Sequence, residues 1–483
     1  MSLVLQFFVQ VIFMQYIFLL TVVVKWGGKL LSLPFFSGIS EQSHNGVLKD
    51  IGNPSWKRPL PYVVVATLSS FLFGYHLGGS TLAEGLVVSS CLGGAFLGSI
   101  FSGLIADGLG RRRSFQLCAL PMIIGSSISA TTSSLGGMLL GRFLVGTGMG
   151  VGPPVVAMYV SEVSPAFVRG TYGSFTQIAT CLGLMTAFFI GIPAKSVLGW
   201  WRVCFWISAI PAVLLAFLME FSAESPHWLL KRGKIADAEE ELERLFGASH
   251  VKPAMAELCK SGRGDDMDTI KISELIHGRH FKVVFLGSVL FALQQLSGIN
   301  AVFYFSSTVF RSAGVSSDIG NICIGVVNLS GSIVAMILMD TLGRKVLLIW
   351  SFLGMALAMG LQVTAASGFL QGSENMYLSV AGMLLFVVTF SLGAGPVPGL
   401  LLSEIFPGRI RATAMAICMA VHWVINFFVG LLFLHLLEIL GPKTLYTVFT
   451  TICLMAVAFV KKNVVETKGK SLHELEMALL PVD

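Results

Sequence analysis

The sequence has 483 residues, of which 54% are hydrophobic and only 12% are charged, with a net charge of +6. Soluble domains carry about 25% charged residues, and the mean hydropathy of this chain is +0.80. These values exclude a water-soluble globular protein, a disordered chain and a nucleic-acid-binding protein. They predict an all-α protein that crosses a membrane many times and contacts its lipid.

Runs without Asp, Glu, Lys or Arg mark the expected membrane spans, because about 20 apolar residues cross the hydrocarbon core. We expect each run to be a helix, because a backbone in lipid must satisfy its own hydrogen bonds. Twelve such runs lie at 59–83, 85–106, 114–141, 143–161, 170–194, 203–219, 283–310, 319–339, 346–373, 375–403, 412–437 and 444–460.

A further uncharged run, 1–24, precedes the twelve. It lacks the charged start of a signal peptide and the Arg- and Ser-rich composition of a transit peptide. It is either an extra membrane helix or the product of an alternative start or a mispredicted exon, and we assign it no function.

Charge sets the topology. Nearly all of the 32 Lys and Arg residues fall on one side if both ends of the twelve-span region lie there, and the positive-inside rule makes that side cytoplasm-like. A charged insertion on this side separates six spans from six. Within it, Ile235, Ala238, Leu242 and Leu245 recur at helical spacing and predict an amphipathic surface helix. The expected parts are an N-terminal segment 1–58, a six-helix bundle 59–221, a helical linker 222–282, a second bundle 283–460 and a tail 461–483.

Two motifs recur in the two halves. D-x-x-G-R-[RK] occurs at 107–112 and 340–345, and S-E-x-x-P-x-x-x-R-x-T occurs at 161–171 and 403–413. Both occupy corresponding loops on the basic side. Related halves of parallel topology predict a substrate site at their interface near the membrane midplane, with one half rocking against the other.

The two repeated motifs occur together with the segments GRFLVGTGMG, ESPHWL, QQLSGINAVFYF, GPVP and VETKGKSL. On these motifs and segments the chain resembles a sugar porter of the major facilitator superfamily from about residue 60 to 475. SLGAGPVPGLLLSEIFP and NVVETKGKSLHELE resemble the plant plastidic glucose transporter branch. The resemblance implies the major facilitator fold and alternating-access transport of a small neutral sugar, a glucose-like hexose. It points to the plastid (chloroplast) envelope, with Golgi and plasma membrane left open.

Uncharged polar side chains within the spans are candidates for sugar contacts. Carboxamides supply donors and acceptors together without burying a charge, and so replace the water that a sugar gives up. A lone amide serves a helix–helix hydrogen bond equally well, but the QQLSGIN cluster, where Gly298 allows a helix break, favours binding. Guided by the resemblance, we expect sugar contacts from Gln177, Gln294, Gln295, Asn300, Asn328, Trp423, Asn426 and Phe390.

Two gates are expected. Tyr304 and Phe305 follow the break and resemble the outer gate of the family, whereas Gly395, Pro396 and Pro398 interrupt the tenth span and predict a flexible inner segment. Many relatives have an acidic residue and a Trp in this region, where this chain has Ser391 and Gly399.

The charges of the repeated loops predict a lock on the cytoplasm-like face that closes the inside of the outward-open state. The alternative is that the positive loops only fix orientation. The expected lock residues are Asp107, Arg111, Arg112, Glu162, Arg169, Glu224, Asp340, Arg344, Lys345, Glu404, Arg411 and Glu466. The family's Pro-Glu-Ser-Pro-Arg is altered here to Ala223-Glu224-Ser225-Pro226-His227.

Arg142 is a fixed charge well inside a span, where an unpaired charge costs at least about 2.5 kcal/mol. An Asp faces this Arg in proton-coupled relatives, but here FGYHLGG supplies His76. Without a titrating carboxylate we expect facilitated uniport. The alternatives are proton symport through His76 and a non-transporting sugar sensor.

The link between His76 and the second span is also shorter than in the family, and residues that line the pocket in the family are therefore expected to be missing here.

The eight cysteines form no metal-ligand spacing, and there is no nucleotide-binding phosphate loop. We therefore expect no metal, no cofactor and no enzymatic activity.

Overall fold

A computed structural model describes residues 54–77, 84–165, 168–194, 199–262, 278, 280–303, 310, 317–367, 373–407 and 410–468. The run 1–24 and the expected gate residues Tyr304 and Phe305 lie outside these ranges. Residues 1–55 form a unit of their own, and the helices below all belong to the second unit, Trp56–Asp483.

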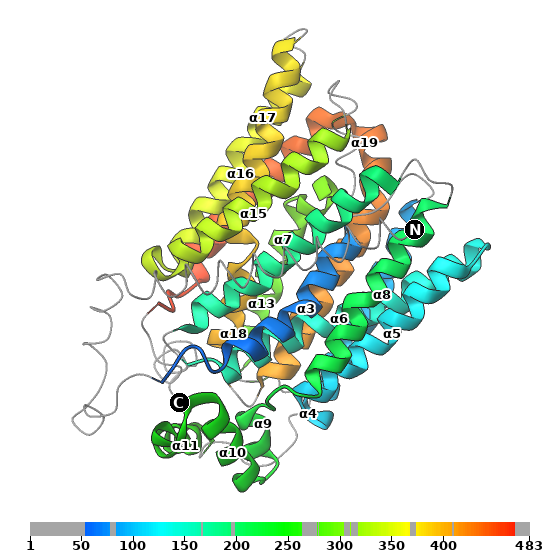
Figure 1. Cartoon of the computed structure of the whole chain (residues 1–483). Helices are drawn as coiled ribbons and strands as arrows, with labels where there is room; N and C mark the ends of the chain where they lie inside the picture. The colour runs from blue at the N-terminus through cyan, green and yellow to red at the C-terminus, as the bar shows by residue number, and fades with distance from the viewer. Residues whose placement is uncertain are drawn as a thin grey trace. The chain divides into compact units, whose positions relative to one another are not determined.

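Every regular element in the described part is helical (Figure 1). The first half contains α3 Leu60–Leu77, α4 Glu84–Leu109, α5 Arg111–Thr131, α6 Leu135–Val163, α7 Arg169–Ala194 and α8 Trp200–Met219. The linker contains α9 Pro226–Lys231, α10 Ile235–Phe246 and α11 Ala248–Gly262. The second half contains α13 Phe281–Leu296, α15 Ser317–Leu342, α16 Arg344–Ala366, α17 Ser373–Thr389, the π-helix η3 Phe390–Ala394, α18 Val397–Ile405 and α19 Arg411–Asn463.

The expected twelve spans are present. Among the described residues, eleven helices are long and apolar enough to cross a membrane, and the shorter apolar helix Leu60–His76 makes the twelfth. The last two spans are joined in α19, which is interrupted at Gly441. Large apolar side chains such as Leu104, Trp350 and Leu357 are more than 60% exposed, as expected for helices whose outer faces meet lipid.

The two halves meet along helix pairs. The most extensive packing between them joins α4 to α19 and α7 to α15. Within the first half, α4 lies very close to α6, because a Cβ on Gly146 would approach the Cys91 carbonyl oxygen to 1.9 Å. Small residues let membrane helices approach in this way. The paired helices enclose the space in which the candidate site lies.

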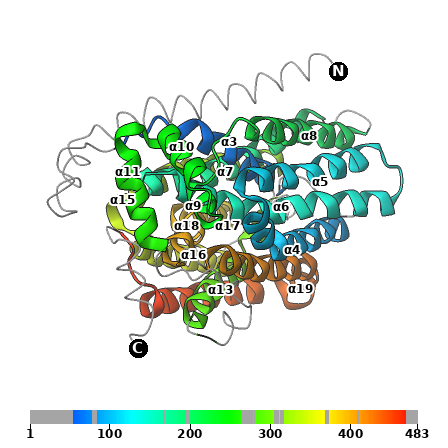
Figure 2. The ribbon, with the colours of Figure 1, turned by 90° about the horizontal axis from the view of Figure 1, so that it is seen from below.

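The linker helices gather at one end of the bundle (Figures 1 and 2). The predicted amphipathic helix is α10, and Ala238, Leu242 and Leu245 are buried there. Ile235 is the exception: it is the first residue of the helix and is 55% exposed. The buried stripe therefore begins at Ala238, and α10 packs against α9 and α11.

Candidate functional site

A cavity of about 180 Å³ lies between the halves. Its lining comes from α3, α6 and α7 of the first half and from α13, α15, η3, α18 and α19 of the second. All but one of the expected sugar-binding residues line it: Gln177, Gln294, Gln295, Asn300, Asn328, Phe390 and Trp423. Asn426 is fully buried but is not part of the lining.

A helix break brings three of these amides to the cavity. The helix α13 ends at Leu296 and helical backbone resumes at Ile299. Between them Gly298 has a φ of +93°, and a Cβ there would lie 2.8 Å from the Phe449 ring. Only glycine fits this conformation and this contact. The break predicted from the sequence is therefore present, and Asn300 lies just beyond it.

The amides form a connected set. Gln295 Nε2 donates to His422 Nδ1 over 3.0 Å, and Asn300 Nδ2 donates to Gln295 Oε1. Gln294 Nε2 donates to the Ala394 carbonyl over 2.5 Å. Each of these amides is nine-tenths or more buried. Because carboxamide oxygens accept two bonds and NH₂ groups donate two, Gln294 and Gln295 retain capacity to bond a ligand.

Two further lining groups are buried and have no hydrogen-bond partner among the described residues. They are the Trp423 indole Nε1, a donor, and the Asn328 Oδ1, an acceptor. Leaving such groups unsatisfied costs about 1–3 kcal/mol each. The Phe73 ring packs edge-to-face on Trp423 at 5.6 Å and fixes the indole plane. A polyhydroxylated, uncharged ligand can satisfy both groups.

The regular α-helix of the tenth span ends before Phe390, slightly ahead of Gly395, where the expected inner gate begins. It bulges into the π-helix η3, closed by the hydrogen bond from Gly395 N to Phe390 O at 2.9 Å. Pro396 and Pro398 lie instead at the start of α18. Since Pro398 has no N–H, the Ala394 carbonyl four residues before it lacks a helical partner. The Gln294 amide takes that place and links the bulge to the cavity.

Ser351 of α16 stabilises the same bulge. Its hydroxyl donates to the Thr389 carbonyl over 2.6 Å and accepts from Ala394 N over 2.8 Å. Neither Ser351 nor His422 was expected from the sequence. His422 is a polar residue inside a span, next to an expected ligand, and on that ground could have been found. Ser351 could not, because a serine in a span most often bonds its own helix backbone.

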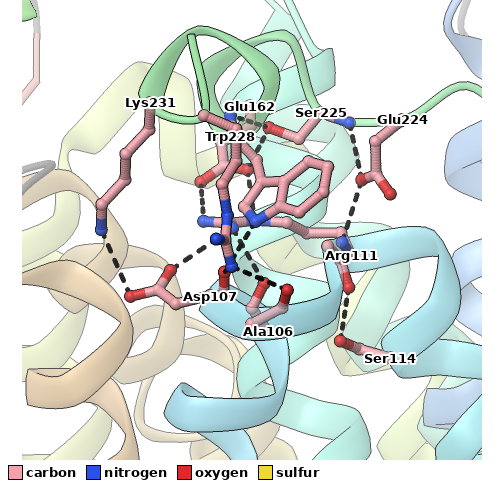
Figure 3. Close-up of polar contacts among 12 residues, drawn as sticks. Ala106, Asp107, Arg111, Ser114, Glu162, Glu224, Ser225, Trp228 and Lys231 are labelled. Atoms are coloured by element: carbon pink, nitrogen blue, oxygen red, sulfur yellow. Dashed lines mark hydrogen bonds and ion pairs between the residues drawn. The ribbon is translucent and has the colours of Figure 1, made fainter. Parts of the chain in front are cut away.

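The charged cluster of the first half is built around a buried carboxylate (Figure 3). Arg111 Nε and Nη2 lie 2.8 and 2.9 Å from the two oxygens of Glu162, and Ser225 Oγ donates to the same carboxylate over 2.5 Å. Asp107 pairs with Arg111 at 3.4 Å and with Lys231 at 3.3 Å. Residues from α4, α5, α6 and the linker are therefore joined in one network.

Glu224 of the linker closes the start of α5. Its carboxylate accepts from the backbone N–H of Arg111 over 2.9 Å and of Arg112 over 3.2 Å. Gly110 precedes the helix with a φ of +89°, and a Cβ there would lie 2.5 Å from the Glu224 carboxylate. An acidic side chain at a helix N-terminus is favourable, because free N–H groups and the helix dipole meet it there.

The second half repeats this arrangement. Arg344 Nη2 pairs with Glu404 at 3.0 Å, and Thr467 Oγ1 donates to Glu404 over 2.6 Å. Glu466 accepts from the backbone N–H of Arg344 and Lys345 at 2.9 and 3.0 Å. The ion pairs described for these clusters join residues of the same half, and the expected lock across the cytoplasm-like face stays a prediction. The side chain of Asp340 lies outside the described set.

Arg411 and Arg169 lie nearer the division between the halves. Arg411 is buried and its Nε donates to the Phe406 carbonyl over 3.3 Å. Arg169 lines the cavity with Ser161 and Ser403, which belong to the repeated motifs. The cavity thus extends from the amides toward the basic side, where the two clusters lie.

His227 lies in the linker helix α9 beside these charges. Its pKa is lowered to about 4, mainly by burial and also by Arg411, Arg169 and Arg111, while Glu162 opposes them. His227 is therefore neutral near pH 7. The position where the family carries an arginine adds no positive charge in this chain.

This pKa predicts a pH-dependent stability. Between the ordinary pKa of 6.5 and about 4, unfolding exposes His227 and takes up a proton. The free energy of unfolding should therefore fall as the pH is lowered through this window, by at most about 1.4 kcal/mol per pH unit. Thermal unfolding in detergent measures it. His227→Gln should flatten the slope, and the control His250→Gln in α11 should not. Equal slopes for wild type and His227→Gln would contradict the assignment.

Arg142 and His76 meet inside the first half. Arg142 Nη1 lies 3.4 Å from His76 Nδ1, and the guanidinium lies 5.6 Å from the Phe205 ring. Both residues are more than nine-tenths buried. The described partners of Arg142 are thus a histidine and an aromatic ring rather than a carboxylate.

Comparison with known proteins shows the family of the chain. The profile of the family described as "Sugar (and other) transporter" matches residues 64–479. The chain belongs to this sugar transporter family. The matched region contains both halves, the cavity and both charged clusters.

Two curated relatives of the transporter come from Arabidopsis thaliana. It is 68% identical to "Probable plastidic glucose transporter 2" over 446 residues, covering 89% of this chain and 90% of that protein. It is 44% identical to "Plastidic glucose transporter 4", covering 87% and 80%.

Solved structures confirm the major facilitator fold of the transporter. The proton:xylose symporter XylE bound to 6-bromo-6-deoxy-D-glucose matches with a TM-score of 0.78 at 29% identity, covering 88% of this chain and 99% of that one. The inward-open conformation of XylE from E. coli matches with a TM-score of 0.67.

Proposed function

We propose that this chain carries a glucose-like hexose across the plastid envelope by alternating access, and that the movement is facilitated uniport. The observation that carries the proposal is the cavity between the halves. Part of it is lined by carboxamides and an indole, with a buried donor on Trp423 and a buried acceptor on Asn328 that have no hydrogen-bond partner in the described part of the chain. Relatives named as plastidic glucose transporters support the sugar and the compartment.

We assign the role of each residue from its position in the cavity wall or in the charged clusters. Gln177, Gln294, Gln295, Asn300 and Asn328 bond the hydroxyls, and Trp423 and Phe390 pack on the sugar's C–H surface. The bulge at η3 and the break at Gly298 let the tenth and seventh spans bend as the cavity changes its open side. The two charged clusters hold the cytoplasm-like ends of each half as rigid units, so that the halves rock as bodies.

Uniport is favoured by the surroundings of Arg142. In its described contacts no carboxylate is available to take up and release a proton during the cycle. The second candidate is proton symport. His76, 3.4 Å from Arg142, is the observation that favours it, because imidazole can titrate near neutral pH.

Proteoliposomes containing the purified chain test the proposal. We expect saturable counterflow of labelled D-glucose that an inwardly directed proton gradient does not accelerate. L-Glucose and protein-free liposomes are the controls. Acceleration by the gradient that His76→Gln abolishes would establish symport instead. No saturable uptake of any hexose would refute the transport assignment.

A further inference from the structure

His422 lies in the cavity wall and is held firmly there. It is on α19, is 9% exposed and lines the cavity next to Trp423. Its ring packs edge-to-face against Trp423 at 5.0 Å and against Phe291 of α13 at 5.3 Å. Two aromatic contacts of this geometry fix both the place and the plane of the imidazole.

The ring is bonded to a proposed sugar ligand. Gln295 Nε2 lies 3.0 Å from His422 Nδ1 and 3.4 Å from its Nε2. At the other end of the same carboxamide, Gln295 Oε1 accepts from Asn300. A carboxamide held at both ends cannot turn over without breaking two hydrogen bonds. Its second N–H lies 3.4 Å from Gln294 Oε1, so it keeps one oxygen lone pair, in a fixed direction, for a ligand.

We propose that His422 is a positioning residue that sets which end of the Gln295 carboxamide meets the sugar, and thereby determines selectivity among hexose epimers. Epimers differ in the direction of one hydroxyl, and a hydroxyl that meets the wrong end of a fixed amide finds donor against donor or acceptor against acceptor. This inference rests on the proposed hexose transport and adds a residue that fixes its selectivity.

The arrangement also requires a particular protonation state. A ring nitrogen that accepts an amide N–H carries no proton, so His422 is neutral with its proton on Nε2. If the ring took up a second proton, Nδ1 would become a donor. Gln295 would then have to turn its oxygen toward His422 and give up the bond from Asn300. The described hydrogen bonds therefore need the neutral ring.

The described contacts of the ring favour this neutral form, because a buried charge without a partner is costly. Its described contacts from α13 are Phe291 and Gln295, and from α19 Trp423, all uncharged. From α3, Phe73 contacts Trp423. The lining residues include one charged side chain, Arg169 of α7, which stays protonated throughout the range used.

Counterflow with the same pH on both sides, between about pH 5.5 and pH 8, tests the proposal without a proton gradient. His422→Phe keeps the ring and removes the acceptor. We expect its KM for D-glucose at neutral pH to rise about 3–10-fold, and the ratio of its KM values for D-galactose and D-glucose to move toward one. His422→Gln offers an acceptor oxygen that does not titrate. We expect a KM near that of the wild type.

The matched control is His435→Gln, at an exposed position on the same helix, which should behave as wild type in KM, epimer ratio and pH profile. An unchanged KM and epimer ratio in His422→Phe would overturn the proposal. If His422→Phe does not fold, the tautomer of His422 in the wild type decides the question.

A measurement independent of transport separates this inference from the proposed function. Nitrogen NMR of the full chain in lipid nanodiscs, with the His422 resonance assigned from His422→Gln, should show protonated Nε2 and unprotonated Nδ1. The opposite tautomer would overturn the positioning role. Failure of the wild type to move any hexose, with the expected tautomer present, would refute the proposed function alone.

Discussion

Replacing Glu162 by glutamine is expected to lower the free energy of unfolding by about 3–5 kcal/mol, which is the cost of removing one partner from a buried ion pair. The Glu162 and Arg111 side chains are 4% and 7% exposed. Among the described residues, the substitution leaves the buried Arg111 guanidinium with Asp107, at 3.4 Å, as its one carboxylate partner. Thermal unfolding and chemical denaturation in detergent measure the loss.

Two further substitutions test whether the loss of stability depends on how deeply the carboxylate is buried. Glu404→Gln removes the equivalent carboxylate of the second half, which is 13% exposed, and should cost less. Glu220→Gln removes a carboxylate that pairs with Arg112 but is 57% exposed, and it should cost the least of the three, because solvent screens an exposed pair. Equal losses for all three variants would contradict the view that burial sets the strength of these clusters.

Replacing Gln294 by alanine is expected to raise the KM for hexose about 5–150-fold. The substitution removes a cavity-lining donor and acceptor and leaves the Ala394 carbonyl without its partner. Each unsatisfied buried group costs about 1–3 kcal/mol, and 1.4 kcal/mol corresponds to a factor of ten. Initial rates of counterflow over a range of sugar concentrations measure the KM.

Gln362 provides the control for this prediction. It is a buried glutamine of α16 whose Nε2 donates to the Ser379 carbonyl over 2.5 Å, and it does not line the cavity. Gln362→Ala therefore also removes a buried amide and frees a carbonyl, but it should lower thermal stability without changing the KM. A similar KM change in both variants would mean that Gln294 acts through stability rather than through the sugar.

The sequence predicts well what depends on local composition. Uncharged runs locate the spans, and helical spacing locates the amphipathic α10 together with its buried Ala238, Leu242 and Leu245. The same pattern overestimates that stripe at Ile235, because periodicity does not say where the covering helices end. The break at Gly298 was predictable because only glycine tolerates the backbone angle found there.

Contacts between distant segments were not predictable in this way. The bond from Gln294 to Ala394 joins residues a hundred positions apart, and that from Gln295 to His422 spans even more. No periodicity encodes such a pairing. The repeated motifs showed that opposite charges gather on one face, but not that Glu162 meets Arg111 within its own half. Partner choice is set by tertiary packing.

The paired carboxylates Glu224 and Glu466 have a consequence for how the molecule is divided. Each comes from the segment that follows its half and accepts hydrogen bonds from backbone N–H groups in the first turn of that half's third span. The repeated unit is therefore six helices together with the acidic segment that follows them. Cutting the chain after Asn463 would remove Glu466 and leave the first N–H groups of α16 without the carboxylate that accepts from them.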